Sequence, residues 1–326
     1  MKLKNTKYYY ILYRSEIGAI ISTSILILVS YFLENAVLTL DSLIIILTLF
    51  AELGVPTVGV AFLMISGEFD LSIGAIFALT PILTILLSSA GIDITLSVIF
   101  SLLIASIIGY VNSLLTLKLK IPSFIATLGV MFTIRGLLLV VTGGFPLEYE
   151  GGYHPLLYLL GGRLSTVWGM RASSIWALVI IFLLAVVLDL TPYGNHVYAS
   201  GGNPTVAQEL GINTNKVKKI NFIISGSLAG IAGLFTLERL KSGDPLYGFG
   251  LELNAIAAAV VGGCSLTGGY GSIIGAALGA LAIAVLRTSF VLLGIPPYWY
   301  EAFIGIILVF AALLNKYISD FVLKHR

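Results

Sequence analysis

The stretch ITLSVIFSLLIASIIGYVNSLLTL, residues Ile94–Leu117, contains no charged side chain and is long enough to cross the hydrocarbon core of a bilayer, which is about 30 Å thick. Nine further apolar runs lie near Ile17–Leu33, Ser42–Ser66, Leu71–Ala90, Phe124–Thr142, Ser174–Leu190, Ile220–Leu237, Leu253–Leu266, Ser272–Leu293 and Trp299–Leu314. The sequence therefore predicts an all-α polytopic integral membrane protein of about ten transmembrane helices, with residues 1–326 forming a single transmembrane domain. The eighth run is short, which favours a broken or re-entrant segment there.

Composition supports this class of protein. Hydrophobic residues make up 58% of the 326 residues and charged residues 10%, with a mean hydropathy of +1.03. A soluble domain carries about 25% charged residues. The net charge of +2 gives no indication of nucleic-acid binding, and the single cysteine, Cys264, excludes a disulfide framework. No phosphate-binding G-x-x-x-x-G-K-[ST] loop occurs and no histidine lies within an apolar run, so the sequence disfavours an intramembrane enzyme.

The Lys and Arg residues predict the orientation of the spans, because they favour the cytoplasmic side of membrane segments. With the N-terminus inside, twelve of them fall on the cytoplasmic side and four fall outside. The four are Arg163, Arg171, Arg239 and Lys241, while Arg135 and Arg287 fall within spans. An even number of spans returns the C-terminus to the same side. We therefore predict a multi-pass protein of the cytoplasmic (inner) membrane of a prokaryote, with both termini in the cytoplasm.

Two loops are predicted to carry structure of their own. Residues 143–173 form the longest outside loop, and their paired glycines and aromatic residues favour a lid or short re-entrant helices. The inside loop, residues 191–219, contains a short polar helix near 203–211. Asn203 is a good N-cap, Pro204 suits the first helical position, and Gly211 suits the C′ position. Because so short a helix is unstable alone in water, we expect it to dock against its own bundle or a partner.

Ionisable residues inside or beside the apolar runs are candidate functional groups, since burying a charge in a membrane is costly. Asp70 lies between the second and third spans, where it either caps the third helix or serves a site. Arg135 lies deep in its span and either pairs with a buried carboxylate, binds an oxygen-rich solute or meets backbone carbonyls. Pro56 and Pro81 are expected to interrupt the second and third spans. Such interruptions are frequent in helices that line a transport pathway.

Two turns share one sequence pattern. Residues 67–74 and residues 262–269 both read G-x-x-x-L-[ST]-x-G. Transporters are often built from repeats around a central site. Both turns are expected on the same side of the membrane, which favours a parallel repeat.

Several short segments rich in polar residues and glycine, in and between the apolar runs, resemble those of a known family. The blocks are Ser66–Gly74, Ile121–Gly129, Arg135-Gly136 with Thr142–Gly144, Thr191–Gly194, Gly201–Pro204 with Ala207 and Gly211-Ile212, Ile224–Gly226 with Ala229-Gly230, and Glu252–Ala258 with Gly262-Gly263, Ser265-Leu266, Gly268-Gly269 and Gly271–Ile273. From about Gly54 to Leu314 the chain resembles the membrane permease subunit of ribose-type sugar importers of the ATP-binding-cassette class. It departs from the family pattern at Asn195, Asn254 and Cys264, so the resemblance does not fix which solute is transported.

The resemblance implies a role for the short polar helix. In this family it is the coupling helix, which docks in a groove of a separate ATPase subunit that binds ATP and Mg; the permease itself holds no cofactor. The alternative is a helix that only caps its own loop. Val206 and Leu210 lie four residues apart and share an apolar face. The expected coupling residues are Asn203, Pro204, Val206, Ala207, Leu210 and Gly211.

The resemblance also implies partners and a pathway. The permease would pair with itself or with a related permease in the lipid bilayer, receive a small sugar such as ribose from an extracytoplasmic binding protein, and pass it between the subunits. The candidate pathway residues are Asp70, Asn112, Thr127 and Arg135. A permease for nucleosides or branched-chain amino acids, and an ion-coupled secondary transporter, remain alternatives. A scaffold without transport is disfavoured by the interrupted spans.

Overall fold

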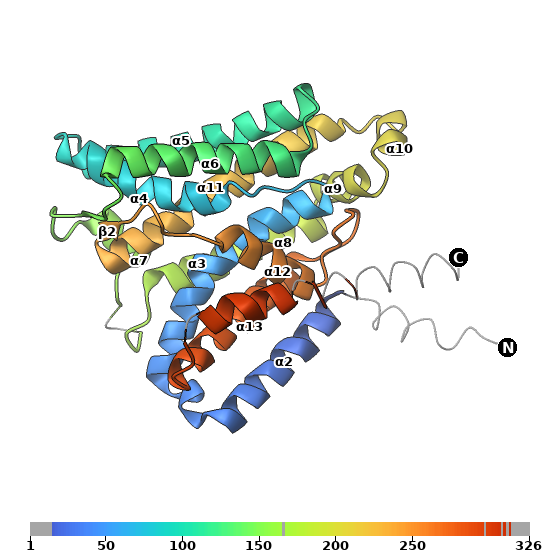
Figure 1. Ribbon diagram of the computed structural model, residues 1–326. Coiled ribbons are helices and arrows are strands. Elements are labelled where there is room, and N and C mark those ends of the chain that lie inside the picture. The colour runs from blue at the N-terminus through green and yellow to red at the C-terminus, as the bar shows by residue number, and fades with distance from the viewer. Residues whose placement is uncertain (1–14, 165–166, 297, 308, 311–312, 314–326) are drawn as a thin grey trace.

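The protein is a bundle of helices, seen in a computed structural model that describes residues 15–164, 167–296, 298–307, 309–310 and 313 (Figure 1). Each expected span corresponds to a helix. Nine of these are α2 (Ser15–Leu33), α3 (Leu40–Ile65), α4 (Ile73–Ser89), α5 (Ile94–Ser113), α6 (Ser123–Thr142), α8 (Ala172–Leu190), α11 (Thr214–Leu240), α12 (Leu251–Val261) and α13 (Ile273–Leu292). The tenth begins with the helical residues 298–307, and its expected end at Leu314 lies outside the described residues. The all-α fold is confirmed.

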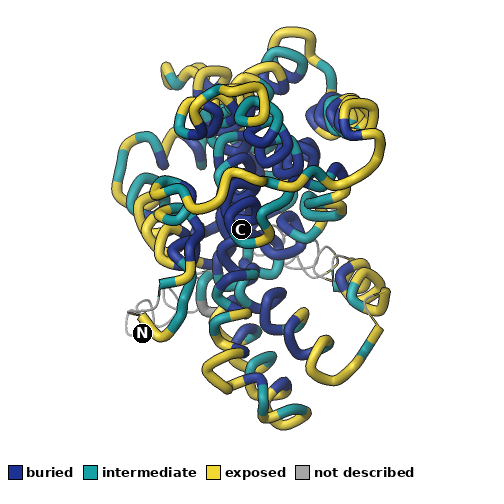
Figure 2. Tube along the Cα trace, turned by 90° about the vertical axis from the view of Figure 1, so that its left-hand side faces the viewer, coloured by how far each residue is buried: buried dark blue, intermediate teal, exposed yellow. Residues whose placement is uncertain are grey.

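The centre of the bundle is formed by α3, α11 and α13. Helix α11 packs against α3, α4 and α5, and α13 packs against α2, α3 and α12. Figure 2 shows these central segments buried and the periphery exposed. Glycines allow the close approach: a Cβ at Gly233 would overlap the Phe77 carbonyl, and one at Gly279 would overlap the Ala258 carbonyl. Small residues are what bring helix backbones together in lipid.

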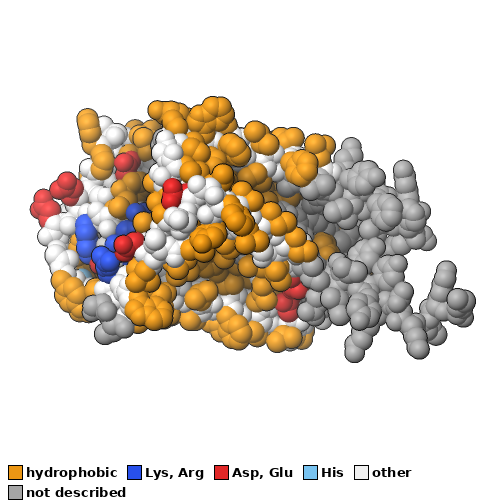
Figure 3. Space-filling model, turned by 90° about the horizontal axis from the view of Figure 1, so that it is seen from below, with side chains coloured by type: hydrophobic (Ala, Val, Ile, Leu, Met, Phe, Trp, Pro, Cys, Tyr) orange, Lys and Arg blue, Asp and Glu red, His pale blue; other side chains and the backbone are white. Residues whose placement is uncertain are grey.

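The outer surface of the bundle is apolar. Among the described residues, six helices are long and apolar enough to cross a membrane by length and composition: those that span residues 40–65, 94–118, 123–142, 172–190, 214–240 and 273–292. Shorter apolar helices cover residues 18–33, 73–89 and 251–261. Figure 3 shows hydrophobic side chains over most of one face, with most of its charged side chains gathered at one end. This distribution suits a protein surrounded by lipid.

Two spans are broken, although not at the prolines. Pro56 and Pro81 lie inside the continuous helices α3 and α4, so the expected interruptions at these residues are wrong. The breaks precede α4 and α12 instead. Residues 66–72 form a non-helical segment before α4, and residues 241–250 form one before α12. Each broken span therefore consists of non-helical chain followed by a short helix.

The eighth span crosses the bundle in this broken form. Gly243 packs against Ile82 on α4, and Gly248 packs further along α4, against Gly74 and Phe77. Beyond α12, the amide of Gly269 donates a hydrogen bond to the carbonyl of Ile65, at the end of α3. The chain between Gly243 and Gly269 thus runs from one end of the bundle to the other. A short helix suffices because non-helical residues complete the span.

The two ends of the bundle carry different structures (Figure 1). At one end lie α7 (Pro155–Gly161) and a two-stranded antiparallel sheet of β1 (Leu147–Glu148) and β2 (Ser242–Gly243). Residues 143–173 thus contain a strand and a short helix, and α7 packs against α8 and α11. We call this the β1–β2 end.

The opposite end, which we call the α10 end, carries α9 (Pro192–Gly202) and α10 (Pro204–Glu209). Helix α11 already begins at Thr214, inside the loop predicted for residues 191–219. That loop is therefore more ordered than the sequence indicated, because α9 was not anticipated. Its polar composition and its glycines at positions 194, 201 and 202 hide its helical character.

Candidate functional site

Asp70 is the centre of a buried hydrogen-bond network at the break before α4. Its side chain is fully buried. Oδ1 accepts from the Ser72 amide at 2.9 Å, from Ser72 Oγ at 2.6 Å and from Asn112 Nδ2 at 3.2 Å. Oδ2 accepts from Ser225 Oγ at 3.1 Å. The carboxylate thereby ties the broken span to α5 and α11, and it does so without acting as the N-cap of α4, which is Ser72.

Thr127 fixes the same segment from α6. Its Oγ1 accepts from the Leu71 amide at 3.0 Å and donates to the Ser123 carbonyl at 2.7 Å. Ser123 Oγ in turn accepts from the Phe69 amide at 3.2 Å. Side chains thus replace the helical hydrogen bonds that this backbone lacks, as a bilayer requires. The predicted residues Asp70, Asn112 and Thr127 therefore come together around one segment, where they form hydrogen bonds with other residues of the protein.

Arg135 lies apart from this network. Its Nη1 donates to the carbonyl of Tyr247 at 2.8 Å and also to the carbonyl of Pro245. Of the three environments considered for this residue, the structure shows backbone carbonyls. Arg135 on α6 thereby holds the non-helical chain that leads into α12, in the way that Thr127 holds the chain that leads into α4.

A cavity of about 350 Å³ lies among α3, α4, α11, α12, α13 and the chain before α12. Ligand sites in proteins typically measure about 300–1,000 Å³. Apolar residues such as Leu53, Phe77 and Ile283 form much of its wall. Its polar lining side chains are Glu52, Thr236, Arg239, Tyr247, Asn254, Arg287 and Tyr300. An apolar wall with a few polar groups suits a small solute that carries hydroxyls.

The polar groups of this cavity form two sets. Arg239 donates from Nε to Glu52 Oε1 at 2.6 Å and from Nη2 to Glu52 Oε2 at 2.9 Å. In the second set, the Arg287 guanidinium lies 5.7 Å from the ring centroid of Tyr300, whose hydroxyl is 3.5 Å from Asn254 Oδ1. Charged hydrogen-bonding groups beside an aromatic ring can bind hydroxyls and cover the apolar face of a sugar ring. Sequence reasoning missed Glu52 and Tyr300, although a glutamate inside an apolar run was a usable signal.

The short helix α10 has the predicted caps. Asn203 Oδ1 accepts from the Val206 amide at 3.1 Å, Pro204 is the first helical residue, and Gly211 has a φ of +85° in the C′ position. The apolar pair Val206 and Leu210 is exposed, by 46% and 77%. Such exposure on a helix at one end of the bundle marks a surface that a partner can cover.

Other contacts fix α10 on the bundle. Ala207 is buried and so shapes the packing of α10, rather than adding to its exposed face. Gln208 Nε2 donates to Thr214 Oγ1 at 2.7 Å, which joins α10 to the start of α11. The helix contacts α9 and α11. Helix α10 therefore packs on its own bundle with one side and exposes Val206 and Leu210 on the other.

Backbones from three parts of the chain meet where α9 leads into α10, at what we call the glycine junction: Gly67, Gly201, Gly268 and Gly269. A Cβ at Gly201 would overlap the Ile65 carbonyl oxygen, which also accepts from the Gly269 amide at 2.8 Å. A Cβ at Gly268 would lie 3.0 Å from Gly67 Cα. The two turns that share the G-x-x-x-L-[ST]-x-G pattern thus touch each other and the α9–α10 connection. A displacement of α10 would therefore be transmitted at this junction to the segments that adjoin both broken spans.

Comparison with known proteins identifies the class of molecule. The model of the family described as "Branched-chain amino acid transport system / permease component" matches residues 42–312. The chain belongs to this permease family. No solved structure matches it significantly.

The permease is similar to curated sugar permeases over nearly its whole length. It is 34% identical to the xylose/arabinose import permease protein of Sulfolobus acidocaldarius, with 93% of this chain and 85% of that protein covered. It is also 34% identical to the ribose import permease proteins of Haemophilus influenzae, covering 93% of this chain and 94% of that protein, and of Bacillus subtilis, covering 92% of both. The resemblance to ribose-type permeases is confirmed, and the chain is a multi-pass membrane permease.

Proposed function

We propose that this permease is the membrane subunit of an ATP-driven importer for a small sugar. Its family and its sugar-transporting relatives support the class of solute. A separate ATPase subunit binds ATP and Mg and supplies the energy. An extracytoplasmic binding protein delivers the sugar, and two permease subunits, identical or related, stand side by side in the membrane. The α10 end faces the cytoplasm, as the basic residues predict.

The observation that carries the proposal is the exposed apolar pair Val206–Leu210 on a capped helix. The helix is held to its bundle through Ala207 and Gln208, yet Val206 and Leu210 on its apolar face are 46% and 77% exposed. A groove on the ATPase subunit would cover that face. When the ATPase subunit moves α10, the close backbone contacts of the glycine junction would transmit that displacement to the non-helical segments before α4 and α12. A two-state interface joined to packed elements is the physical basis for linking distant sites.

The cavity that contains the Glu52–Arg239 pair would be the transient binding site of the sugar during transport. It is formed where helices of the β1–β2 end meet the broken eighth span, and broken spans mark the sites of many transporters. Asn254 and Arg287 offer hydrogen bonds to hydroxyls, and Tyr300 offers a ring face. The Asp70 network lies outside this cavity and stabilises the break. Arg135 shapes the cavity by holding the backbone at Tyr247, which lines it.

Sugar-stimulated ATP hydrolysis by the reconstituted complex tests the coupling surface. The variant Leu210→Asp places a charge on the exposed apolar face and should lower stimulated hydrolysis about tenfold or more. Thr205→Asp is the matched control, because Thr205 is exposed and shares a neighbouring side of α10 with the acidic Glu209 instead of the side that carries Val206 and Leu210. If both variants couple like the wild type, the proposed docking at α10 is wrong.

The same complex tests the solute and the energy source. Stimulation by a pentose and not by a nucleoside or a branched-chain amino acid would support the sugar. Uptake into vesicles that contain the permease without any ATPase subunit, driven by a proton or sodium gradient, would overturn the ATP-driven mechanism altogether.

A further inference from the structure

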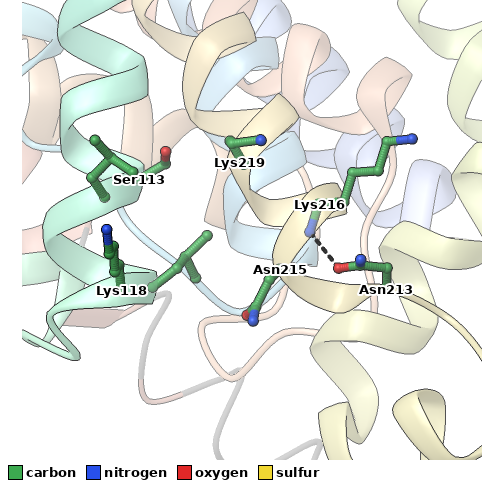
Figure 4. Close-up of a pocket in the computed structure, with 8 residues that line it drawn as sticks. Ser113, Lys118, Asn213, Asn215, Lys216 and Lys219 are labelled. Atoms are coloured by element: carbon green, nitrogen blue, oxygen red, sulfur yellow. Dashed lines mark hydrogen bonds between the residues drawn. The ribbon is translucent and has the colours of Figure 1, made fainter.

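A second cavity, which shares no lining residue with the cavity assigned to the sugar, lies at the α10 end between α5 and α11. It measures about 520 Å³. One wall is η2 (Leu114–Lys118), a π-helical turn that continues α5, and the other is the first turn of α11. We call it the lysine groove. Figure 4 shows Ser113 and Lys118 on one side of it and Asn213, Asn215, Lys216 and Lys219 on the other.

The lysine groove carries an excess of positive charge. Lys118, Lys216 and Lys219 line it, and no described residue offers a carboxylate within ion-pair distance of any of the three. The neighbouring Lys218 differs, because its Nζ lies 2.7 Å from Glu68 Oε1. Lys219 Nζ lies over the ring of Tyr110, 5.9 Å from its centroid, and this cation–π contact does not neutralise the positive charge. Three cations around one cavity, none with a counter-ion among the residues that the structure describes, are suited to an anionic ligand.

Neutral hydrogen-bonding groups accompany these cations. The side chain of Asn213 accepts from the Lys216 amide at 2.9 Å and caps α11, which leaves its own amide group able to donate outward. Asn215 is exposed in the same cavity. Donors of this kind suit the oxygens of a phosphate, to which lysine binds as a point charge.

The apolar surroundings of the groove indicate what carries the phosphate. Leu114 and Leu117 line it beside the lysines. Toward the middle of the bundle, the face of α5 continues from Leu114 through Tyr110 to Ile107, which are 40% and 52% exposed. These positions follow at helical spacing, so they form one apolar stripe that leads into the basic groove. A soluble protein has no access to that stripe, whereas an acyl chain would lie along it.

We propose that the lysine groove binds the headgroup of an anionic phospholipid, with an acyl chain of the lipid along the α5 stripe. Basic pockets between membrane helices on the cytoplasmic side are suited to such headgroups. The π-helical turn contributes by widening the end of α5, where the Leu119 amide bonds the Leu114 carbonyl at 3.1 Å. The site is independent of the sugar and lies beside the first turn of α11, which α10 contacts through Gln208 and Thr214.

Lipid retention by the whole permease tests the proposal. The permease is placed in nanodiscs of phosphatidylcholine with a small fraction of phosphatidylglycerol, and the phosphatidylglycerol that stays bound is counted by native mass spectrometry. The triple variant Lys118→Gln/Lys216→Gln/Lys219→Gln should retain about tenfold less phosphatidylglycerol than the wild type. Equal retention by the two proteins overturns the proposal.

Single variants keep the test decisive if the triple variant folds poorly. Lys216→Gln should lower retention, and Lys120→Gln should not, because Lys120 is exposed at the same end of the bundle but does not line the groove. Equal effects of these two substitutions would show a general charge effect and would overturn the site.

Two further experiments distinguish a bound lipid from a soluble anion and from a protein partner. Inorganic phosphate, added to permease in pure phosphatidylcholine, should leave the thermal unfolding midpoint unchanged, while phosphatidylglycerol raises it. If phosphate alone raises the midpoint as much, the ligand is a soluble anion. If the triple variant keeps its lipid and instead loses its ATPase subunit, the groove is a protein-docking surface, and the lipid proposal is wrong.

Discussion

Arg239 near the end of α11 donates two hydrogen bonds to Glu52 of α3, and both residues line the cavity assigned to the sugar. The pair joins two of the three central helices, and its side chains are only partly exposed, by 28% for Arg239 and 11% for Glu52. Such a bidentate pair has a fixed geometry, which an isolated charge in this position would lack. It can stabilise the bundle and present polar groups to a solute at once.

Breaking this pair should destabilise the permease more than removing it. Glu52→Gln leaves the Arg239 charge without its partner and should cost about 2 kcal/mol, less than the roughly 3–5 kcal/mol of fully buried pairs because Arg239 keeps some exposure. The double variant Glu52→Gln/Arg239→Gln should recover part of that loss. Thermal unfolding in detergent measures the difference. Equal unfolding midpoints for the single and double variants would contradict the predicted cost of leaving the Arg239 charge unpaired.

A methyl group should be rejected at Gly201 and accepted at Gly202. The Cβ of Gly201→Ala overlaps the Ile65 carbonyl, so the glycine junction must open, at a cost of about 1–3 kcal/mol. The nearest atom to a Cβ at Gly202 is Gly269 Cα at 3.8 Å, which is ordinary contact. Sugar-stimulated ATP hydrolysis and the unfolding midpoint should fall in the first variant and stay near wild type in the second. Equal behaviour of the two alanine variants would contradict the close packing.

Loss of the α10 cap should weaken coupling without unfolding the bundle. Asn203→Ala removes the acceptor of the Val206 amide and should cost about 1 kcal/mol locally. Stimulated ATP hydrolysis should fall, and Asn203→Ser should restore it because serine also caps. If the alanine variant hydrolyses ATP as the wild type does, the ends of α10 do not need this cap for coupling.

Asp70→Asn should lower the folded yield of the permease more than it alters the solute preference. The carboxylate accepts four hydrogen bonds, and an amide in its place presents a donor to groups that already donate. We expect a loss of about 1–3 kcal/mol for the unsatisfied group. Size-exclusion chromatography and the unfolding midpoint report the fold, and the ranking of sugars by stimulated hydrolysis reports preference. A changed ranking at unchanged stability would place Asp70 in the pathway.

Arg135→Ala should release the chain before α12 and impair transport while the permease still assembles with its partners. The carbonyls of Pro245 and Tyr247 lose their donor, and the cavity wall at Tyr247 loosens. Arg135→Lys should recover only part of the activity, since an ammonium is a more compact donor than the guanidinium fork. Uptake into vesicles containing the whole complex measures the effect. Full activity of the alanine variant would show that the cavity does not depend on this contact.

The parts of the fold that were predictable are those governed by local chemistry. Apolar runs gave the positions of the spans, because each crossing of a bilayer needs a long stretch of predominantly apolar residues. The caps of α10 were readable from Asn203, Pro204 and Gly211, since each acts through the backbone next to it. The composition of the loop at 191–219 did not reveal α9, whose helix is stabilised by packing against α8 and α11.

The parts that were not predictable depend on residues far apart in the chain. Glu52 and Arg239 are separated by 187 positions, and nothing beside Glu52 indicates its partner. Arg135 reaches carbonyls 110 and 112 positions away, which a pattern of side chains cannot reveal. The second and third spans were predicted to be interrupted at Pro56 and Pro81, because a proline marks a local weakness, whereas the break before α4 is stabilised by side chains of other helices. The break in the eighth span was predicted from its short apolar run, but the contacts that stabilise it were not.

The broken eighth span has a consequence for how the protein is made. Helix α12 has 11 residues, which at about 1.5 Å each cannot cross a bilayer, and the chain before it has backbone groups that lipid cannot satisfy. Partners for that chain lie on helices synthesised earlier, as with Arg135 of α6. During synthesis this segment therefore cannot leave the insertion machinery as an independent hydrophobic helix, and it enters the membrane only onto a bundle that already holds α3, α4 and α6.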